Sequence, residues 1–357
     1  MSNLPLAEDL TVKWRADNLN DMPQRVMQQI VGVTDHLSLE NVRECSAWMQ
    51  DCVDELIGYN EKLSISLCSN KVEIQLNPTN YDQGDFTITI YRKEHGYTII
   101  HPNSPPKNVD EGNYLAAGAQ EFCKIFKYPK NHVKEVHMEF APWRQGNRLD
   151  DSSLVPFVQT LQESVKNRND LLSAEQLNLN FEKNENCVGA LVPIFKPKVL
   201  KSLFIQTENT FSASIPVETL MFLDQWRHLE KLMIRGWPLE DVRFEWFMRI
   251  PDLWLEVETL TVEFTKLALE KFRLGSASKY TVYFAQRGNG VAEYLNGTCE
   301  LEKLEERNTW SAISLTGQFR VELKEDRLLL FPEIVAPIRG SILDVETIEL
   351  SNSEHLI

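Results

Sequence analysis

Basic residues are few relative to acidic ones, and this imbalance limits the classes of partner that the chain can bind. The 357 residues include 37 Lys and Arg against 52 Asp and Glu, which gives a formal net charge of -15. Nucleic acids and anionic membrane surfaces both attract an excess of Lys and Arg. No apolar run reaches the roughly 20 residues of a membrane-spanning helix, and the first residues lack the pattern of a signal peptide. We therefore expect no nucleic-acid partner and no membrane partner.

The sequence also lacks the short motifs that mark metal sites and active sites. Its six cysteines include no Cys-x-x-Cys pair, and its seven histidines include no His-x-x-x-His pair. No Walker loop and no Gly-x-Ser-x-Gly turn is present. We therefore expect no enzyme activity, no cofactor and no metal. Without a secretory signal, we expect free thiols and a cytoplasmic or nuclear location.

Apolar residues make up 43% of the chain and aromatic residues 10%, which is enough for a sizeable core. The length favours two to three domains or one elongated array. Local patterns divide the chain into five parts. These are an arm over 1–18, a helix pair over 19–60, an antiparallel β region with a helix over 61–130, a repeat region over 131–275 and a β-rich cap over 276–357.

Two short helices are predicted in the second part, from about residue 21 to 31 and from about 38 to 57. Asp21 and Ser38 are suitable N-caps. Apolar residues recur every three to four positions after each cap, so that each helix has one apolar face. A helix pair of this size cannot enclose its own core. Its apolar face therefore either packs on the rest of the chain or meets a partner.

Alternating apolar residues predict a small antiparallel sheet over about 62–101, and a helix is expected from about 112 to 126. After it, the pattern apolar-x-x-apolar-x-apolar occurs over 133–138, 174–179, 200–205, 229–234 and 257–262. The starts lie 41, 26, 29 and 28 residues apart, with helical stretches over 154–165, 187–195, 216–228 and 239–248. Strand and helix in such alternation predict a short α/β solenoid of leucine-rich-repeat type, whose units bury a core by stacking.

The last part predicts a β meander that caps the repeat stack. Its expected strands lie over 280–285, 291–295, 298–304, 313–315, 319–323 and 328–331. Asn296-Gly297 between two of them is a typical hairpin turn. Arg287 to Gly290 contains two glycines but no lysine, and we expect no helix after it. We therefore interpret this segment as a turn and not as a phosphate loop.

In a solenoid of this kind, the strand residues between the apolar positions form an open concave face. Most of these residues are polar, but Phe204 and Met233 are apolar and lie on adjacent predicted strands. Exposed apolar residues rimmed by polar groups often mark an interaction site. The candidate target-binding residues are His137, Asn178, Phe204, Lys231, Met233 and Arg235. Alternatively, the C-terminal sheet or a helix covers Phe204 and Met233. We expect Trp237, Trp246 and Trp254 to pack in the core or in loops.

The helix pair resembles an F-box, which contains a Met-Pro dipeptide, a Val/Met helix ending in Ile, and a Ser-Leu start leading to Val-Arg, Cys and Trp. This resemblance implies docking on the Skp-type adaptor of a cullin ubiquitin ligase. The adaptor-binding residues that it implies are Leu19, Met22, Pro23, Val26, Met27, Ile30, Leu39, Val42, Arg43, Cys45 and Trp48. The sequence departs from the family at Arg25, where an acid is usual, and at Ser46 and Ala47, where a basic residue is usual.

The repeat region resembles the FTH domain of the nematode F-box A family. The segments that carry this resemblance are 223–227, 229–234 and 243–247, and the stretches 62–100 and 112–126 are similar to the middle section of that family. The two resemblances together cover residues 19 to about 275. They imply a substrate-recognition adaptor of a Skp–cullin–F-box ligase that binds an unknown protein target. The alternative is a non-catalytic repeat scaffold with a degenerate F-box.

Overall fold

The structure is a computed structural model, and it describes only part of the chain. The described residues are 59–78, 86–102, 104–126, 132–140, 151–168, 170–181, 187–207, 217–240, 243–298, 301–304, 308–315 and 317–333. The predicted helix pair lies outside the described residues, and so do the adaptor-binding residues from Leu19 to Trp48. Their role therefore stays a prediction. In the part that is described, no helix is long and apolar enough to cross a membrane.

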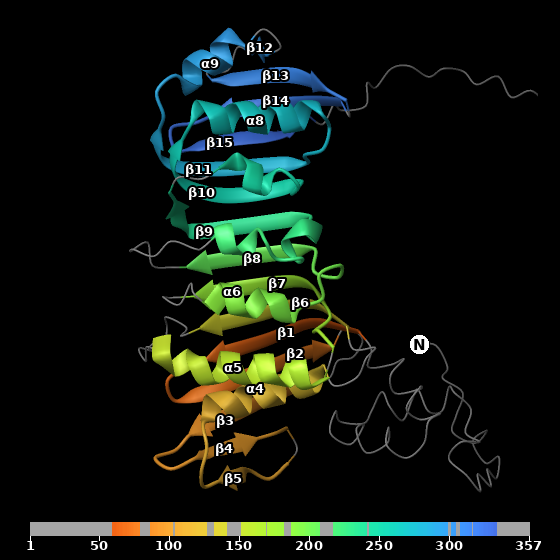
Figure 1. Ribbon diagram of the computed structural model, residues 1–357, viewed down its shortest axis with the longest axis vertical. Helices are drawn as coiled ribbons and strands as arrows, with labels where there is room; N and C mark the ends of the chain where they lie inside the picture. The colour runs from red at the N-terminus through yellow and green to blue at the C-terminus, as the bar shows by residue number, and fades with distance from the viewer. Residues whose placement is uncertain are drawn as a thin grey trace, which may run out of the picture.

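One large sheet runs through the described chain, and helices cover it on one side (Figure 1). The sheet has 15 strands in the order β12-β13-β14-β15-β11-β10-β9-β8-β7-β6-β1-β2-β3-β4-β5. The predicted mixed α/β class is confirmed. The predicted antiparallel region, repeat region and cap are parts of the same sheet.

Five antiparallel strands form one end of this sheet, and the alternation over 62–101 predicts the first four of them. They are β1 (Tyr59–Leu67), β2 (Lys71–Pro78), β3 (Phe86–Arg92), β4 (Tyr97–Ile100) and β5 (Lys107–Val109). Helix α4 (Tyr114–Ile125) packs on β2 and β3, and the Asn113 side chain caps it by accepting from the Leu115 and Ala116 amides. The helix lies so close to the sheet that a Cβ at Gly118 would meet Val72 Cγ1 at 2.8 Å.

Six parallel strands form the centre, and they lie side by side in chain order from β6 to β11. They are β6 (His132–Phe140), β7 (Ala174–Phe181), β8 (Ser202–Thr207), β9 (Lys231–Leu239), β10 (Asp252–Leu260) and β11 (Lys279–Arg287). Their buried residues stack in register, for example Leu177 opposite Leu203 and Leu203 opposite Leu232. β1 pairs in parallel with β6, so the antiparallel end continues directly into the centre. The leucine-rich-repeat assignment of this array stays a prediction.

The predicted position of the fifth repeat strand is wrong. β10 begins at Asp252 and buries Leu253, Leu255 and Val257, whereas the expected window began at Val257. Thr261, which lies inside the expected window, is instead the N-cap of α8 (Val262–Arg273) and accepts a hydrogen bond from the Phe264 amide at 3.1 Å. β11 is a sixth parallel strand, although its residues were expected in the meander.

The connections between the parallel strands are helical but mostly short. They are α5 (Asp151–Arg168), α6 (Val188–Leu191), η5 (Val192–Ile194), α7 (Val217–Leu220), η6 (Trp226–His228), η7 (Phe244–Phe247) and, between β10 and β11, the longer α8. The expected helix over 154–165 is confirmed by α5. The helix expected over 239–248 is reduced to the single turn η7, because Leu239 still belongs to β9.

The cap is a meander of β12 (Glu302–Lys303), β13 (Thr309–Ser314), β14 (Gly317–Leu323) and β15 (Arg327–Pro332), and β15 pairs with β11. The expected strand over 291–295 and the hairpin at Asn296-Gly297 are wrong, because α9 (Val291–Gly297) is a helix. Val291 and Leu295 are both buried at a spacing of four, which places them on one helical face. Gly290, with φ of 86°, occupies the N-cap in the left-handed region. A helix therefore does follow the glycine turn.

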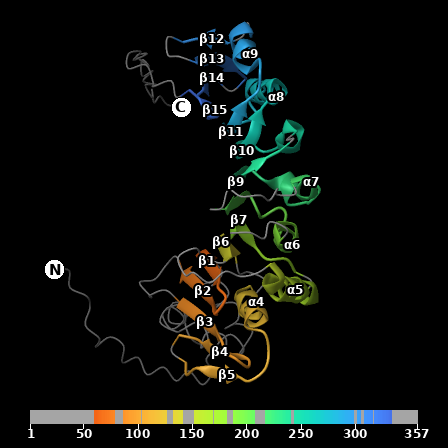
Figure 2. The ribbon, with the colours of Figure 1, turned by 90° about the vertical axis from the view of Figure 1, so that its left-hand side faces the viewer.

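The labelled helices α4 to α9 all lie on the same face of the sheet, and the sheet curves away from them (Figure 2). The opposite face of the central strands is therefore concave and carries no described helix. The buried apolar row of each central strand points towards the helices, so the alternate residues point into the concavity. This arrangement determines which side chains can form a candidate site.

Candidate interaction surface

The concave face presents one row of side chains at the middle of the parallel strands. Strand pairing places His137 opposite Asn178, Asn178 opposite Phe204, Phe204 opposite Met233 and Met233 opposite Trp254. We call His137, Asn178, Phe204, Met233 and Trp254 the central row. Neighbouring strands are about 4.8 Å apart, so these side chains are consecutive neighbours on one surface.

The structure brings all six predicted target-binding residues together. His137, Asn178, Phe204 and Met233 are successive members of the central row. Lys231 and Arg235 lie two positions before and two positions after Met233 in β9, on the same face. Both side chains are exposed. Their placement on one face confirms the alternation argument, while target binding by these residues stays a prediction.

The half of the face on β6 and β7 is a hydrogen-bonded polar network. Asn178 Nδ2 donates to Glu135 Oε1, and Gln176 Nε2 donates to Asn178 Oδ1 at 3.2 Å. At its edge, the Ser66 hydroxyl donates to Glu139 Oε2 at 3.2 Å. These groups satisfy one another, so this half is stable in water without a partner.

His137 lies inside that network. Burial lowers the pKa of His137, and Lys62 lowers it further, whereas Glu139 and Glu135 oppose the shift. The ring is therefore neutral at physiological pH. Ser64 lies opposite His137 on β1, but these two described residues form no hydrogen bond. A serine nucleophile needs an adjacent base within hydrogen-bond reach, so this pair does not form a catalytic unit.

The half of the face on β8 to β11 is apolar and cationic. Phe204, Met233 and Trp254 are each half-buried, so neither a helix nor the C-terminal sheet buries them completely. Lys231 Nζ lies 5.3 Å from the Phe204 ring centroid, and the Arg235 guanidinium carbon lies 5.9 Å from that of Trp254. Such cation–π contacts hold the long basic side chains against the apolar surface.

Trp254 is the functional candidate that the sequence interpretation placed wrongly. We expected core or loop packing, yet Trp254 lies in the central row with its ring 4.9 Å from that of Tyr283. The period of two around it gives the signal, because Leu253 and Leu255 on either side are fully buried. Trp246 does pack against the core, and its carbonyl accepts from Trp226 Nε1 at 2.9 Å. The Trp237 side chain lies outside the described residues.

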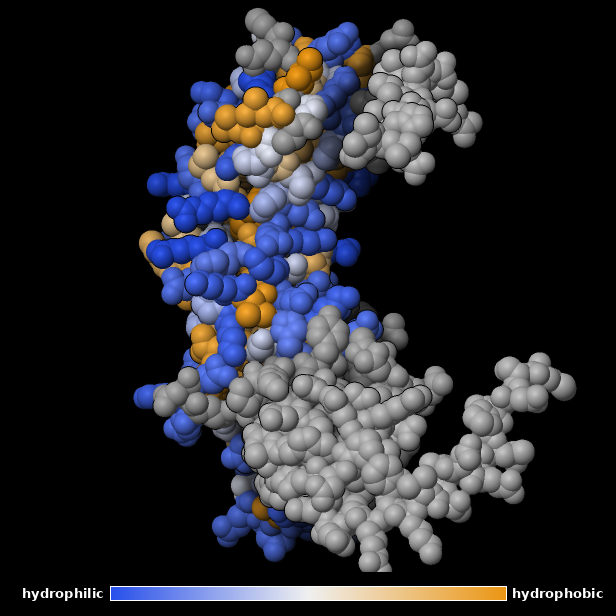
Figure 3. Space-filling view, turned by 90° about the vertical axis from the view of Figure 1, so that its right-hand side faces the viewer, coloured by the Kyte–Doolittle hydropathy of each residue, from blue (hydrophilic) through white to orange (hydrophobic). Residues whose placement is uncertain are grey.

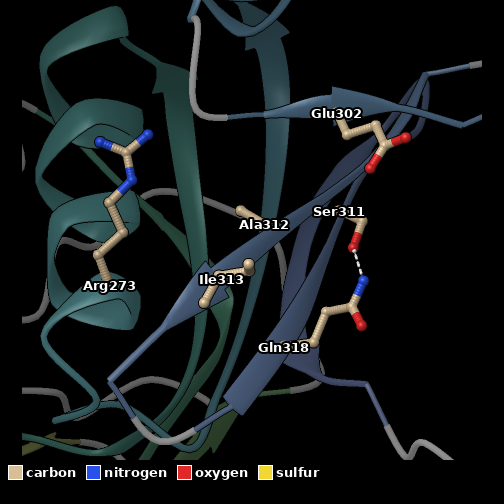
Figure 4. Close-up of a pocket in the computed structure, with 6 residues that line it drawn as sticks. All are labelled: Arg273, Glu302, Ser311, Ala312, Ile313 and Gln318. Atoms are coloured by element: carbon tan, nitrogen blue, oxygen red, sulfur yellow. Dashed lines mark hydrogen bonds between the residues drawn. The ribbon is translucent and has the colours of Figure 1, made fainter.

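A depression of about 500 Å³ lies near the end of α8, between this helix and the cap strands (Figure 4). Its lining residues are Arg273, Glu302, Ser311, Ala312, Ile313 and Gln318. Ser311 accepts from Gln318 Nε2 at 2.6 Å and donates to Glu333 Oε2 at 3.2 Å. Glu333 also pairs with Arg320 at 3.3 Å. Ser311 is only 2% exposed, so the depression offers no accessible activated nucleophile.

Three exposed apolar side chains lie beside this depression. Leu274, Ile313 and Leu315 are 58%, 83% and 80% exposed. Leu274 directly follows α8, Ile313 belongs to β13, and Leu315 lies between β13 and β14. Apolar side chains gather at this end of the molecule in Figure 3. Among the described residues, no three His, Cys, Asp or Glu side chains are grouped to hold a metal ion.

Comparison with known families gives one match. Residues 156–270 match the FTH domain. The matched segment runs from within α5 to within α8 and contains β7, β8, β9 and β10. The predicted resemblance to the FTH domain is thereby confirmed over this part of the chain. No curated protein and no solved structure matches the chain.

Proposed function

We propose that this chain, whose residues 156–270 match the FTH domain, is a non-catalytic adaptor that binds a target protein through its concave face. The observation that carries the proposal is the position of Phe204, Met233 and Trp254 on an open face beside Lys231 and Arg235. The FTH family is associated with F-box proteins, which supports an interaction role. Four of the strands that form the face belong to the matched segment.

The chemistry of the face favours a protein partner over a small molecule. Aromatic residues, Met and Arg are enriched at the centres of protein interfaces, and Trp and Arg dominate their hot spots. The amide side chains Gln176, Asn178 and Asn180 can exchange hydrogen bonds with a peptide backbone or with polar side chains. A small ligand needs an enclosed pocket, whereas this face is broad and curved.

The proposal assigns the second contact to the N-terminal helix pair. In this proposal Met22, Pro23, Val26, Ile30 and Trp48 contact the Skp-type adaptor of a cullin ubiquitin ligase, as the F-box resemblance implies. The chain then raises the effective concentration of the target near the ligase without taking part in the chemistry. Ubiquitin transfer itself is assigned to the other ligase subunits.

The alternative is a repeat scaffold that binds its target but has lost the adaptor. The departures at Arg25, Ser46 and Ala47 favour this alternative, because they lie within the F-box-like segment. A pull-down of the full chain with a purified Skp-type adaptor separates the two functions. The scaffold leaves the adaptor in solution, whereas the ligase adaptor retains it.

One experiment tests the concave face and the predicted N-terminal helix pair with two sets of variants. Affinity capture from cells with the proteasome blocked is compared for the parent chain and for Phe204→Glu with Met233→Glu. Two buried charges at an interface centre are expected to reduce capture of the target at least about tenfold. Phe222→Glu is the matched control, because Phe222 is 73% exposed and follows α7 on the helical side.

The second set is Pro23→Ala with Ile30→Glu, compared with Gln28→Glu on the polar side of the same predicted helix. The first variant is expected to abolish co-purification with the Skp-type adaptor while circular dichroism and target capture stay unchanged. Loss of both partners in either double variant, or of neither, contradicts the division into two faces.

A further inference from the structure

Beyond Trp254, the line of the central row passes over β11 and reaches an apolar residue on β15, the cap strand next to it. In register, Trp254 lies opposite Thr281, and Thr281 lies opposite Leu329 of β15. Thr281 is buried, while Leu329 is half-buried like Phe204, Met233 and Trp254. We call Phe204, Met233, Trp254 and Leu329 the apolar stripe. It runs across the strands from β8 to β15, so its length is four strand spacings or about 19 Å.

Basic side chains flank the apolar stripe on both sides. Lys231 and Lys279 lie on one side, since both pair with Asp252 in register. Arg235 and Arg327 lie on the other side, where Arg327 is opposite Tyr283 and donates to its hydroxyl at 2.9 Å. Four cations around one apolar stripe are notable in a chain with a net charge of -15.

Only part of this positive charge is neutralised within the described chain. Lys231 pairs with Asp252 at 3.4 Å, and Arg327 pairs with Asp326 at 3.4 Å. Arg235 and Lys279 are exposed and have no carboxylate partner within 4 Å among the described residues. The nearby Glu256 carboxylate accepts from the Gly236 amide at 2.6 Å. A ligand with carboxylates on both sides of an apolar surface complements this arrangement.

The dimensions of the apolar stripe and its flanking cations fit an α-helix lying along the stripe. Lys231 and Arg235 are four residues apart in one strand, which is about 13 Å along the strand direction. An α-helix with its side chains is about 10–12 Å wide, so a helix lying on the stripe reaches the cations on both sides. The length of about 19 Å corresponds to about 13 helical residues. An extended peptide directs alternate side chains to opposite faces, so it cannot present acids along both edges of an apolar row.

We propose that the apolar stripe binds one amphipathic helix of the target protein, whose apolar face is flanked on both sides by Asp or Glu. This proposal rests on the proposed function, because it names the partner of the same concave face. The helix apolar face covers Met233 and Trp254, and its acidic flanks pair with Arg235 and Lys279. Helix-in-groove recognition of this kind needs anchors every three to four residues along the partner.

The test uses the full chain and a labelled synthetic peptide of about 14 residues, with Leu every three or four positions and Glu on both flanks. Fluorescence anisotropy measures its binding, and circular dichroism measures the helix content of the peptide when bound. Two further peptides are the controls. One has Lys in place of every Glu, and the other has the same composition in scrambled order. We expect the first peptide to gain helix content on binding and to bind at least about tenfold more tightly than either control. Its binding should weaken as added salt screens the charges.

Charge reversal on the protein locates the site. Arg235→Glu and Lys279→Glu are each expected to weaken binding of the Glu-flanked peptide about tenfold, or about 1.4 kcal/mol. Each is also expected to improve binding of the Lys-flanked peptide. Lys266→Glu is the matched control, because Lys266 is an exposed cation on α8 on the opposite face. It should leave both affinities unchanged.

Three outcomes overturn the proposal. They are equal binding of all three peptides, binding without a gain in helix content, and a chain that self-associates through the stripe in a way that Arg235→Glu abolishes. The proposed function is judged separately by the capture experiment. If Phe204→Glu with Met233→Glu loses the target while Arg235→Glu and Lys279→Glu retain it, the acidic helix is refuted and the concave target-binding face stands.

Discussion

Gly236 directly follows Arg235 in β9, and Gly236→Ala is predicted to destabilise the fold. Its φ is 84°, in the left-handed region that residues with a Cβ avoid. The pairing of β9 with β10 is irregular here, because Ile234 lies opposite Leu255 while Leu239 lies opposite Val257. Five residues of β9 therefore span what two residues of β10 span, and Gly236 lies within this extra length. Glycine, which has no Cβ, adopts this left-handed conformation without strain.

Two separate costs determine the magnitude. A left-handed conformation costs a residue with a Cβ about 1–2 kcal/mol. An alanine Cβ at Gly236 would also lie 2.2 Å from the Thr207 carbonyl oxygen, so the end of β8 must shift. Forced overpacking typically costs about 1–3 kcal/mol. We therefore expect Gly236→Ala to lower the free energy of unfolding by about 2–5 kcal/mol. The hydrogen bond from the Gly236 amide to Glu256, at 2.6 Å, is strained by the same shift.

Urea unfolding followed by tryptophan fluorescence and circular dichroism measures this effect. With an m-value of about 3 kcal/mol per M, the midpoint should fall by about 1 M. Gly189→Ala is the matched control, because Gly189 lies in α6 and its added Cβ would have its nearest contact, Thr219 Cγ2, at 4.0 Å. This control should be neutral or stabilising by up to about 1 kcal/mol. An unchanged midpoint for Gly236→Ala would refute the argument from backbone geometry.

Two further predictions concern the face and the core. The folded state lowers the pKa of His137 below its ordinary value of 6.5, so neutral His137 contributes stability above pH 6.5 that is lost as the pH falls below it. His137→Asn should therefore flatten the decline in urea midpoint between pH 7.5 and pH 5, and an unaltered decline contradicts this assignment. Leu203 is fully buried between Leu177 and Leu232, so Leu203→Ala should cost about 2–5 kcal/mol in the same urea assay. Leu274→Ala, at a 58% exposed position, should cost less than about 1 kcal/mol.

Sequence periodicity was sufficient to predict the strands whose two faces differ clearly. In β6 to β9, most buried positions are aliphatic and the positions between them mostly polar, so the alternation is visible. The same alternation predicted the antiparallel strands β1 to β4. It also placed the six candidate target-binding residues on one surface, because register follows once each strand is correctly positioned.

Periodicity misplaced β10, because two overlapping stretches fit the repeat pattern. Ile250, Leu253 and Leu255 fit it as well as Val257, Leu260 and Val262 do, so the pattern alone did not determine where the strand begins. The repeat pattern then matched later, from Val257, and Trp254 was assigned to packing. In α9 the failure has another cause. The spacing of four residues between the apolar residues Val291 and Leu295 fits one face of a strand as well as one face of a helix. Only contacts with the rest of the chain decide such short segments.

Trp254, which the sequence interpretation placed wrongly, belongs to the candidate site. Parallel sheets are normally covered on both faces, and their strands are then apolar throughout. Here the described helices cover one face, and the other face is polar over β6 and β7, where it needs no cover. Over β8 to β10 the face instead carries Phe204, Met233 and Trp254, each still half-buried rather than enclosed. A face that is stable in water at one end and incompletely covered at the other matches a surface for a reversible partner better than a permanent domain interface.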